Sequence, residues 1–178
     1  MRRKVAIFTS NPFRQKIILN KAKQHKQIVY GARSIQAQLG ILSRQTQDWD
    51  VFTSNPKTHA QETEKELDKQ IGFDYYYTKP GVHKGTYKVK GKGFDLKKET
   101  IDDEGIVDYT SMPKPAPKFV ILNGIRYRKL NEEIKAKKKA VKDPAYKFRK
   151  EKDQGDLNRI KTIQRAEIIK RRKFPKVK

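Results

Sequence analysis

Two carboxylates separated by a single residue have the clearest chemical consequence in this sequence. Asp48 and Asp50 flank Trp49 in a stretch that runs to Phe52 and is expected to be a strand. Because successive side chains of a strand point to opposite faces, both carboxylates lie on one face. Two such charges repel each other, whereas a divalent cation binds both, and Mg²⁺ favours oxygen ligands together with substrate phosphates. The pair predicts a metal site, although Asp-x-Asp also occurs on ordinary surface strands.

A third carboxylate extends this set. Asp108 lies among apolar residues in a second expected strand, Ile106 to Tyr109, and could come alongside Asp48 and Asp50. Three carboxylates around two metal ions suit in-line phosphoryl or nucleotidyl transfer, in which one ion activates the attacking oxygen and the other holds the departing pyrophosphate. The alternative is that Asp108 is an edge-strand carboxylate satisfied by its neighbours.

A glycine turn offers a place for phosphate. Gly31 ends the expected strand at residues 28–30 and opens a helix, so that a phosphate could approach backbone N–H groups at the positive end of that helix. Arg33 and Ser34 would add a charge and a hydrogen-bond donor.

The hydrophobic pattern predicts the elements that must position these groups. Apolar residues recur at helical spacing after Pro12, Gly31, Pro56 and Lys129, and each of these runs predicts a helix. Asp143-Pro144 is expected to end the last of these helices, and a further helix is expected near residues 156–163. Strands are expected at 5–8, 28–30, 49–52, 75–78, 86–89 and 106–109, and at 119–122 and 125–127 around the hairpin signal Asn123-Gly124. The prediction is an α+β fold, a mixed sheet flanked by helices with a basic helical C-terminal segment.

These motifs resemble a known superfamily. Gly31-Ala32-Arg33-Ser34, followed after 13 residues by Asp48-Trp49-Asp50, resembles the nucleotidyltransferases of the DNA polymerase β superfamily. Arg44-x-Thr46-x-Asp48-x-Asp50 is most similar to the minimal enzymes of the AbiEii toxin type. The basic run from Lys147 to Leu157 resembles the helical segment of those enzymes, which is rich in Lys and Arg and contains an Asp-Leu pair.

The resemblance implies roles for individual residues. Asp48, Asp50 and Asp108 would be the metal ligands and catalytic carboxylates, with Mg²⁺ or Mn²⁺ and a nucleoside triphosphate as cofactors. Gly31, Arg33 and Ser34 would contact phosphate, and Lys147 and Asp153 would lie near the nucleotide or the acceptor. The chain departs from the family at Ala32 and Arg33, where a second small residue usually follows the glycine, and this leaves an inactive copy as an alternative.

The charge points to a polyanionic partner. The 178 residues carry a net charge of +23, of which residues 111–178, with 23 Lys and Arg against 7 Asp and Glu, hold +16. Such an excess favours nucleic acid. Aromatic and basic residues also interleave in a pattern suited to stacking bases, although alternate tyrosines could face the core. The expected nucleic-acid contacts are Tyr75, Tyr77, Lys79, Lys84, Tyr87, Lys88, Arg171, Arg172 and Lys173.

Other features narrow the class of protein. The chain has no cysteine, which excludes a thiolate site, and no apolar run long enough to span a membrane. His25, His59 and His83 show no metal-binding spacing and are expected to be surface or packing residues. We expect a soluble protein, cytoplasmic or internal to a virion.

The expected organisation is an N-terminal strand and helix extension (1–27), an α/β core (28–122), a basic helical segment (123–169) and a basic tail (170–178). Two functions remain open. The first is metal-dependent transfer of a nucleoside monophosphate to a nucleic acid or protein. The second is an inactive copy of the fold that serves as a basic nucleic-acid-binding, virion or assembly component, within a larger protein assembly.

Overall fold

The computed structural model describes residues 12–40, 48–95 and 100–173. The strand expected at 5–8 and the residues Arg44 and Thr46 lie outside these ranges. The elements are α1 (Pro12–Gln24), β1 (Ile28–Tyr30), α2 (Ala32–Leu39), β2 (Trp49–Thr53), α3 (Pro56–Ile71), β3 (Tyr76–Pro80), β4 (Thr86–Asp95), β5 (Thr100–Ser111), β6 (Phe119–Leu122), β7 (Ile125–Arg128), α4 (Leu130–Lys142), the 3₁₀ helix η1 (Pro144–Arg149) and α5 (Lys150–Lys173).

Within the described residues, seven strands form one open mixed sheet in the order β3-β4-β5-β2-β1-β7-β6. Strand β2 pairs in parallel with β5 and antiparallel with β1, while β1 pairs in parallel with β7. The antiparallel strands β3-β4-β5 extend the sheet at one edge and the hairpin β6-β7 extends it at the other. The α+β class with a mixed sheet is confirmed.

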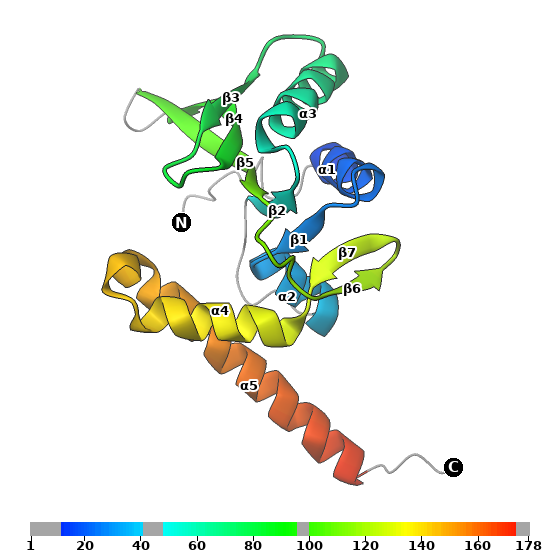
Figure 1. Cartoon of the computed structure of the whole chain (residues 1–178), viewed down its shortest axis with the longest axis vertical. Helices are drawn as coiled ribbons and strands as arrows, with labels where there is room; N and C mark the ends of the chain where they lie inside the picture. Colours follow the sequence, from blue (N-terminus) through cyan, green and yellow to red (C-terminus); the bar gives the residue numbers. More distant parts are fainter. Residues whose placement is uncertain (1–11, 41–47, 96–99, 174–178) are drawn as a thin grey trace, which may run out of the picture.

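Helices α1 and α3 pack on each other and against the sheet, whereas α2, α4 and α5 lie together away from them (Figure 1). Burial alternates along β2: Trp49, Val51 and Thr53 are buried, and Asp50 faces the other way. Apolar side chains of α1, α3 and the central strands form the core, among them Ile18, Ala60, Leu67, Val29, Val51, Val107 and Tyr109. The inward side chains of β2 thus hold the strand in place and leave its opposite face for polar groups.

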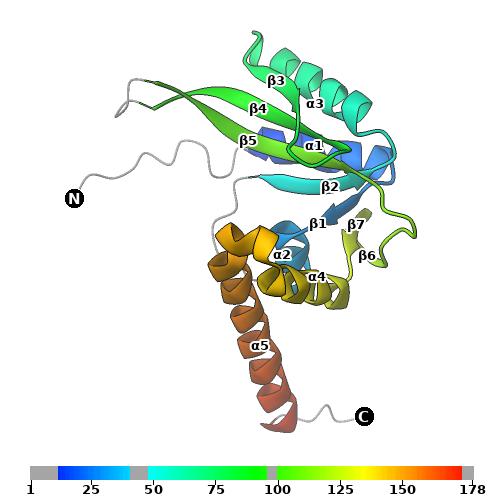
Figure 2. The ribbon, with the colours of Figure 1, turned by 60° about the vertical axis from the view of Figure 1, so that its left-hand side comes forward.

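The C-terminal helices form an arm that leaves the sheet (Figure 2). Asp143 caps η1 by accepting a hydrogen bond from the Ala145 N–H at 3.0 Å, so the predicted break at Asp143-Pro144 is confirmed. Helix α5 extends to Lys173, and therefore includes residues 170–173, which the sequence pattern predicted to belong to a tail. Its Ile, Lys, Arg, Glu and Ala residues have adequate helix propensity, which charge alone does not override.

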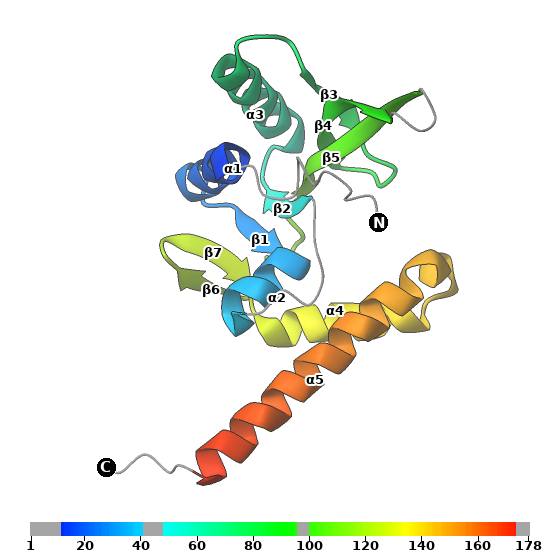
Figure 3. The same ribbon diagram turned by 180° about the vertical axis from the view of Figure 1, so that it is seen from behind.

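The division of the chain at residues 27, 122 and 169 stays a prediction. In the structure, α1 packs against α3 and β7 pairs with β1, so segments on both sides of the expected core contribute to one sheet and its cover (Figure 3).

Candidate active site

A row of polar side chains crosses four neighbouring strands on the sheet face opposite α1 and α3. The strand register pairs Tyr30 of β1 with Asp50 of β2, and Asp50 with Asp108 of β5. Asp108 in turn pairs with Lys88 of β4, and the Lys88 ammonium donates a short hydrogen bond to the Asp108 carboxylate. Asp48 lies just before β2 on the same face as Asp50. The structure therefore brings the three predicted carboxylates together.

Burial and mutual repulsion disfavour negative charge in this row. The pKa of Asp50 is raised to about 7, first by burial and then by the neighbouring charges of Asp48 and Asp108. Burial also raises the pKa of Asp108, against the opposing effect of Lys88. Carboxylates in this state take up a proton or a cation. Their oxygen-only donor set fits Mg²⁺ or Mn²⁺, the ions expected from the sequence.

A pocket of about 330 Å³ opens above the carboxylates and has a cationic side. The acidic lining is Asp48, Asp50 and Asp108, and the basic lining is Lys88, Lys137, Arg149 and Lys152. The positive charges of Arg149 and Lys152 lower the pKa of Asp50, which places both cations within electrostatic reach of the acidic row. The pocket thus presents carboxylates on the sheet and cations on the C-terminal helices.

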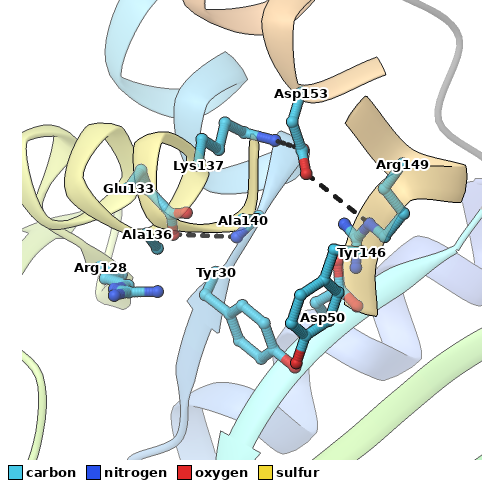
Figure 4. Close-up of a pocket in the computed structure, with 11 residues that line it drawn as sticks. Tyr30, Asp50, Arg128, Glu133, Ala136, Lys137, Ala140, Tyr146, Arg149 and Asp153 are labelled. Carbon is cyan, nitrogen blue, oxygen red and sulfur yellow. Dashed lines mark hydrogen bonds and ion pairs between the residues drawn. The ribbon is translucent and has the colours of Figure 1, made fainter. Parts of the chain in front are cut away.

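A second pocket of about 170 Å³ adjoins the first, since Gly31, Asp50, Lys137 and Arg149 line both. Figure 4 shows that it lies between the end of β1 and the helices α4, η1 and α5, with Tyr30, Asp50 and Tyr146 on one side and Glu133 on the other. The two pockets together offer room for groups beyond a single metal ion.

Gly31 is required where the chain leaves β1. Its φ is 71°, and a Cβ there would lie 2.5 Å from Asp50 Oδ2. Its N–H donates a hydrogen bond of 2.9 Å to the buried carboxylate of Glu133, whose pKa burial raises to about 7. The N–H group expected to meet a phosphate is therefore engaged by a side chain of α4.

Arg33 and Ser34, the other predicted phosphate contacts, line neither pocket. Ser34 is fully buried, and its Oγ donates a hydrogen bond of 2.7 Å to the carbonyl oxygen of Arg128. The guanidinium of Arg33 lies over the Trp49 ring, 4.7 Å from its centroid. Both side chains join α2 to the sheet.

Of the two residues predicted near the nucleotide or acceptor, one lines a pocket and the other does not. Lys147 is exposed on η1 and lines neither pocket. Asp153 is 2% exposed, lines the smaller pocket, and accepts a hydrogen bond of 2.7 Å from Lys137. Lys137 and Glu133 belong to the site but were missed in the sequence, because each lies in a run of similar charged residues and only tertiary packing distinguishes them.

The aromatic and basic cluster is spread over the β3-β4 hairpin. Tyr75 and Tyr87 pack against the core, whereas the Lys79 ammonium lies 6.0 Å from the Tyr77 ring centroid. Lys84 is exposed. Arg171, Arg172 and Lys173 belong to the last turn of α5. Nucleic-acid binding by this cluster stays a prediction.

Comparison with solved structures identifies the class of fold. The polyadenylate synthase of Megavirus matches with a TM-score of 0.64 at 18% sequence identity, over 82% of this chain and 30% of that chain. JHP933 from Helicobacter pylori matches with a TM-score of 0.51 at 13% identity, over 82% and 62%. An antigenic nucleotidyltransferase-like protein from Paracoccidioides brasiliensis gives 0.46 at 10% identity, over 84% and 75%. No protein-family model matches the chain, and no curated protein matches its sequence.

The chain has a nucleotidyltransferase-like fold, as the sequence motifs predicted. It spans less than a third of the polyadenylate synthase chain and less than two thirds of the JHP933 chain. Membership of the AbiEii toxin type stays a prediction. Among the described residues, no helix combines the length and apolar character needed to cross a bilayer.

Proposed function

We propose that this protein is a metal-dependent nucleotidyltransferase that moves a nucleoside monophosphate from a nucleoside triphosphate to a nucleic acid or protein acceptor. The observation that carries the proposal is the row of Asp50, Asp108 and Lys88 in register, with Asp48 beside it, facing a pocket whose other wall is cationic. A structural row of carboxylates would be expected to pair with fixed cations throughout, whereas burial disfavours the charged form of Asp50.

The carboxylates have the role of holding Mg²⁺ or Mn²⁺. Asp48, Asp50 and Asp108 would supply the oxygen ligands, and a divalent ion would relieve the repulsion that raises the pKa of Asp50 while displacing its proton, so that metal binding would strengthen as the pH rises. When bound, such ions activate the attacking oxygen and neutralise the departing pyrophosphate. Lys88 fixes the orientation of Asp108 through its hydrogen bond.

The basic wall would bind the triphosphate. Arg149 and Lys152 line the larger pocket, and Arg side chains favour phosphate because the planar guanidinium can donate two parallel hydrogen bonds. Lys137 lines the pocket too, but its ammonium is paired with Asp153 and Asp156 and would hold the wall in place. Phe148 is 81% exposed and lines the same pocket, which offers an apolar surface for a base of the nucleotide or acceptor. The minimal AbiEii type remains the subtype that the Asp48 and Asp50 motif favours.

A second function is favoured by the charge of the C-terminal arm. Exposed basic side chains continue from α4 through η1 to α5, and they are Lys135, Lys138, Lys139, Lys142, Lys147, Lys150, Lys152, Arg159, Lys161 and Arg165. This surface suits a nucleic-acid backbone, either as the acceptor of the enzyme or as the ligand of an inactive copy inside a virion or an assembly. Either role belongs in an intracellular or virion-internal setting.

A label-transfer assay tests the catalytic proposal. Protein would be incubated with Mg²⁺ or Mn²⁺, each of the four nucleoside triphosphates labelled at the α-phosphate, and RNA, DNA or protein acceptors. We expect label transfer and pyrophosphate release by wild type, loss of both in Asp50→Asn, and retention of both in Asp74→Asn, since the Asp74 side chain is 84% exposed.

No pyrophosphate release with any nucleotide, combined with salt-dependent binding of nucleic acid that survives Asp50→Asn, would refute the transferase and support the inactive alternative.

A further inference from the structure

Two histidines and a glutamate meet on the side of the sheet covered by α1 and α3, away from the acidic row. His25 follows the C-terminal end of α1, and His59 and Glu62 lie one turn apart on α3. One potential ligand atom from each residue lies within 4.8 Å of the others. Neither histidine was expected to bind metal, because the packing of α1 on α3, which brings His25 to α3, leaves no spacing motif in the sequence.

We propose that His25, His59 and Glu62 form a site for a transition-metal ion, of which Zn²⁺ is the best match. Two imidazoles and one carboxylate are a common Zn²⁺ ligand set, with a water molecule available as the fourth ligand. Hard oxygen-preferring ions such as Mg²⁺ do not favour imidazole, so this site and the acidic row select different metals. The proposal is independent of the proposed transferase activity.

The arrangement of His25 and Glu62 supports a bound cation. His25 Nε2 lies 3.2 Å from Glu62 Oε2, yet this buried nitrogen makes no hydrogen bond among the described residues. A buried polar atom without a hydrogen bond is costly. An ion between the nitrogen lone pair and the carboxylate would satisfy both groups.

His59 is already oriented by groups behind it. Its Nδ1 lies 2.5 Å from Thr53 Oγ1 and 3.2 Å from Gln27 Nε2, and all three residues are buried. In the tautomer that donates Nδ1–H to Thr53, the Nε2 lone pair is free to bind a metal, and the Gln27 amide N–H, which can only donate, bonds to Thr53 Oγ1 at 3.3 Å rather than to His59. Metal-binding histidines commonly donate their second ring nitrogen in this way, which fixes the ring and its tautomer.

The exposure of the site and the position of the nearest cation are both compatible with a bound metal ion. The side chain of Glu62 is 38% exposed and that of His25 is 23% exposed, so an ion and a water ligand can enter from that side. Lys21 competes for Glu62 at 3.9 Å, but its ammonium lies closer to Glu66, at 3.1 Å, and can remain there when an ion binds. The two rings stack with centroids 4.1 Å apart, and metal binding would require them to rotate until their in-plane lone pairs converge on one ion.

Metal titration of the full chain tests the site, with Mg²⁺ present in excess to occupy the acidic row. We expect wild type to bind one Zn²⁺ and, with Co²⁺ as the probe, to show the intense visible absorption of a tetrahedral site. His25→Gln and Glu62→Gln should weaken Zn²⁺ binding roughly tenfold or more and abolish that absorption. The exposed His83 supplies a matched control, and His83→Gln should bind as wild type does.

Three results would overturn the site. One is a wild type that binds no Zn²⁺ under these conditions. Another is Zn²⁺ binding that is unchanged in both His25→Gln and Glu62→Gln, while circular dichroism shows that both variants are folded. Binding that disappears in Asp50→Asn but persists in His25→Gln would likewise overturn it, because the ion would then occupy the acidic row.

Discussion

Replacing Lys137 should destabilise the protein more than any other single lysine change in α4. Its ammonium lies 2.7 Å from Asp153 Oδ1 and 2.8 Å from Asp156 Oδ2. The exposed fraction of the residue is 6% for Lys137, 2% for Asp153 and 1% for Asp156. These contacts join α4 to α5 beneath the pocket. In Lys137→Met the methylene volume is largely retained, but two buried carboxylates lose the cation they share.

Breaking a buried pair by removing one partner typically costs about 3–5 kcal/mol, because the remaining charge stays buried. Arg149 offers only partial compensation, since it lies 3.8 Å from Asp153 and its side chain is 43% exposed. We therefore expect Lys137→Met to lower the free energy of unfolding by about 3 kcal/mol. For a chain of this length, that corresponds to a fall in Tm of about 10 °C.

Urea denaturation followed by circular dichroism measures this loss. The adjacent Lys138 is exposed, so Lys138→Met is the matched control and should change the free energy of unfolding by less than about 0.5 kcal/mol. The triple variant Lys137→Met, Asp153→Asn, Asp156→Asn should be more stable than Lys137→Met alone, because no buried charge is left without its partner. Equal stabilities for Lys137→Met and Lys138→Met would show that the buried ion pairs do not hold α4 to α5.

Two further predictions concern the turn after β1. Gly31→Ala should destabilise the protein by about 2–3 kcal/mol and weaken nucleotide binding, because its Cβ would displace Asp50. Gly40→Ala has a similar φ of 67°, but its Cβ would meet no atom of the described residues within 4 Å, so it should cost about 1 kcal/mol and leave binding unchanged in a parallel titration. Glu133 has a pKa of about 7 in the folded protein against an ordinary value of 4.5, so the folded state binds an extra proton between these values. Its contribution to stability should therefore fall by on the order of 3 kcal/mol as the pH rises through this interval. Urea denaturation from about pH 5 to 8 should show the full loss in wild type and in Glu132→Gln and a smaller loss in Glu133→Gln, in which Asp50, whose pKa is also raised to about 7, still contributes. Equal pH slopes in all three proteins would contradict this role of Glu133.

Local patterns in the sequence predicted much of the fold and part of the site. Strand alternation placed Asp48 and Asp50 on one face, and the register of β2 with β5 places Asp108 beside Asp50. Proline and glycine signals located the starts of α1 and α3 and the hairpin at Asn123-Gly124. The alternation and the proline and glycine signals depend on neighbours a few residues apart, which is why the sequence reveals them, whereas the pairing of Asp108 with Asp50 is decided by the sheet.

The rest of the site depends on contacts between distant segments. Gly31 and Glu133, which share a hydrogen bond, are 102 residues apart. Lys137 is buried because it packs against Asp153 of α5, and its lysine-rich run contains no signal that distinguishes it from Lys138. His25 and His59 meet because α1 packs against α3. No periodicity or motif encodes these pairings.

A metal and nucleotide site at the acidic row can be tested by titrating Mn²⁺ and labelled nucleoside triphosphates into wild type, Asp50→Asn and Asp74→Asn at a salt concentration that suppresses non-specific binding. We expect Mn²⁺ and nucleotide to bind together to wild type and to Asp74→Asn, and Asp50→Asn to lose both. Binding that is absent from wild type, or equal in all three proteins, would mean that these carboxylates do not form such a site.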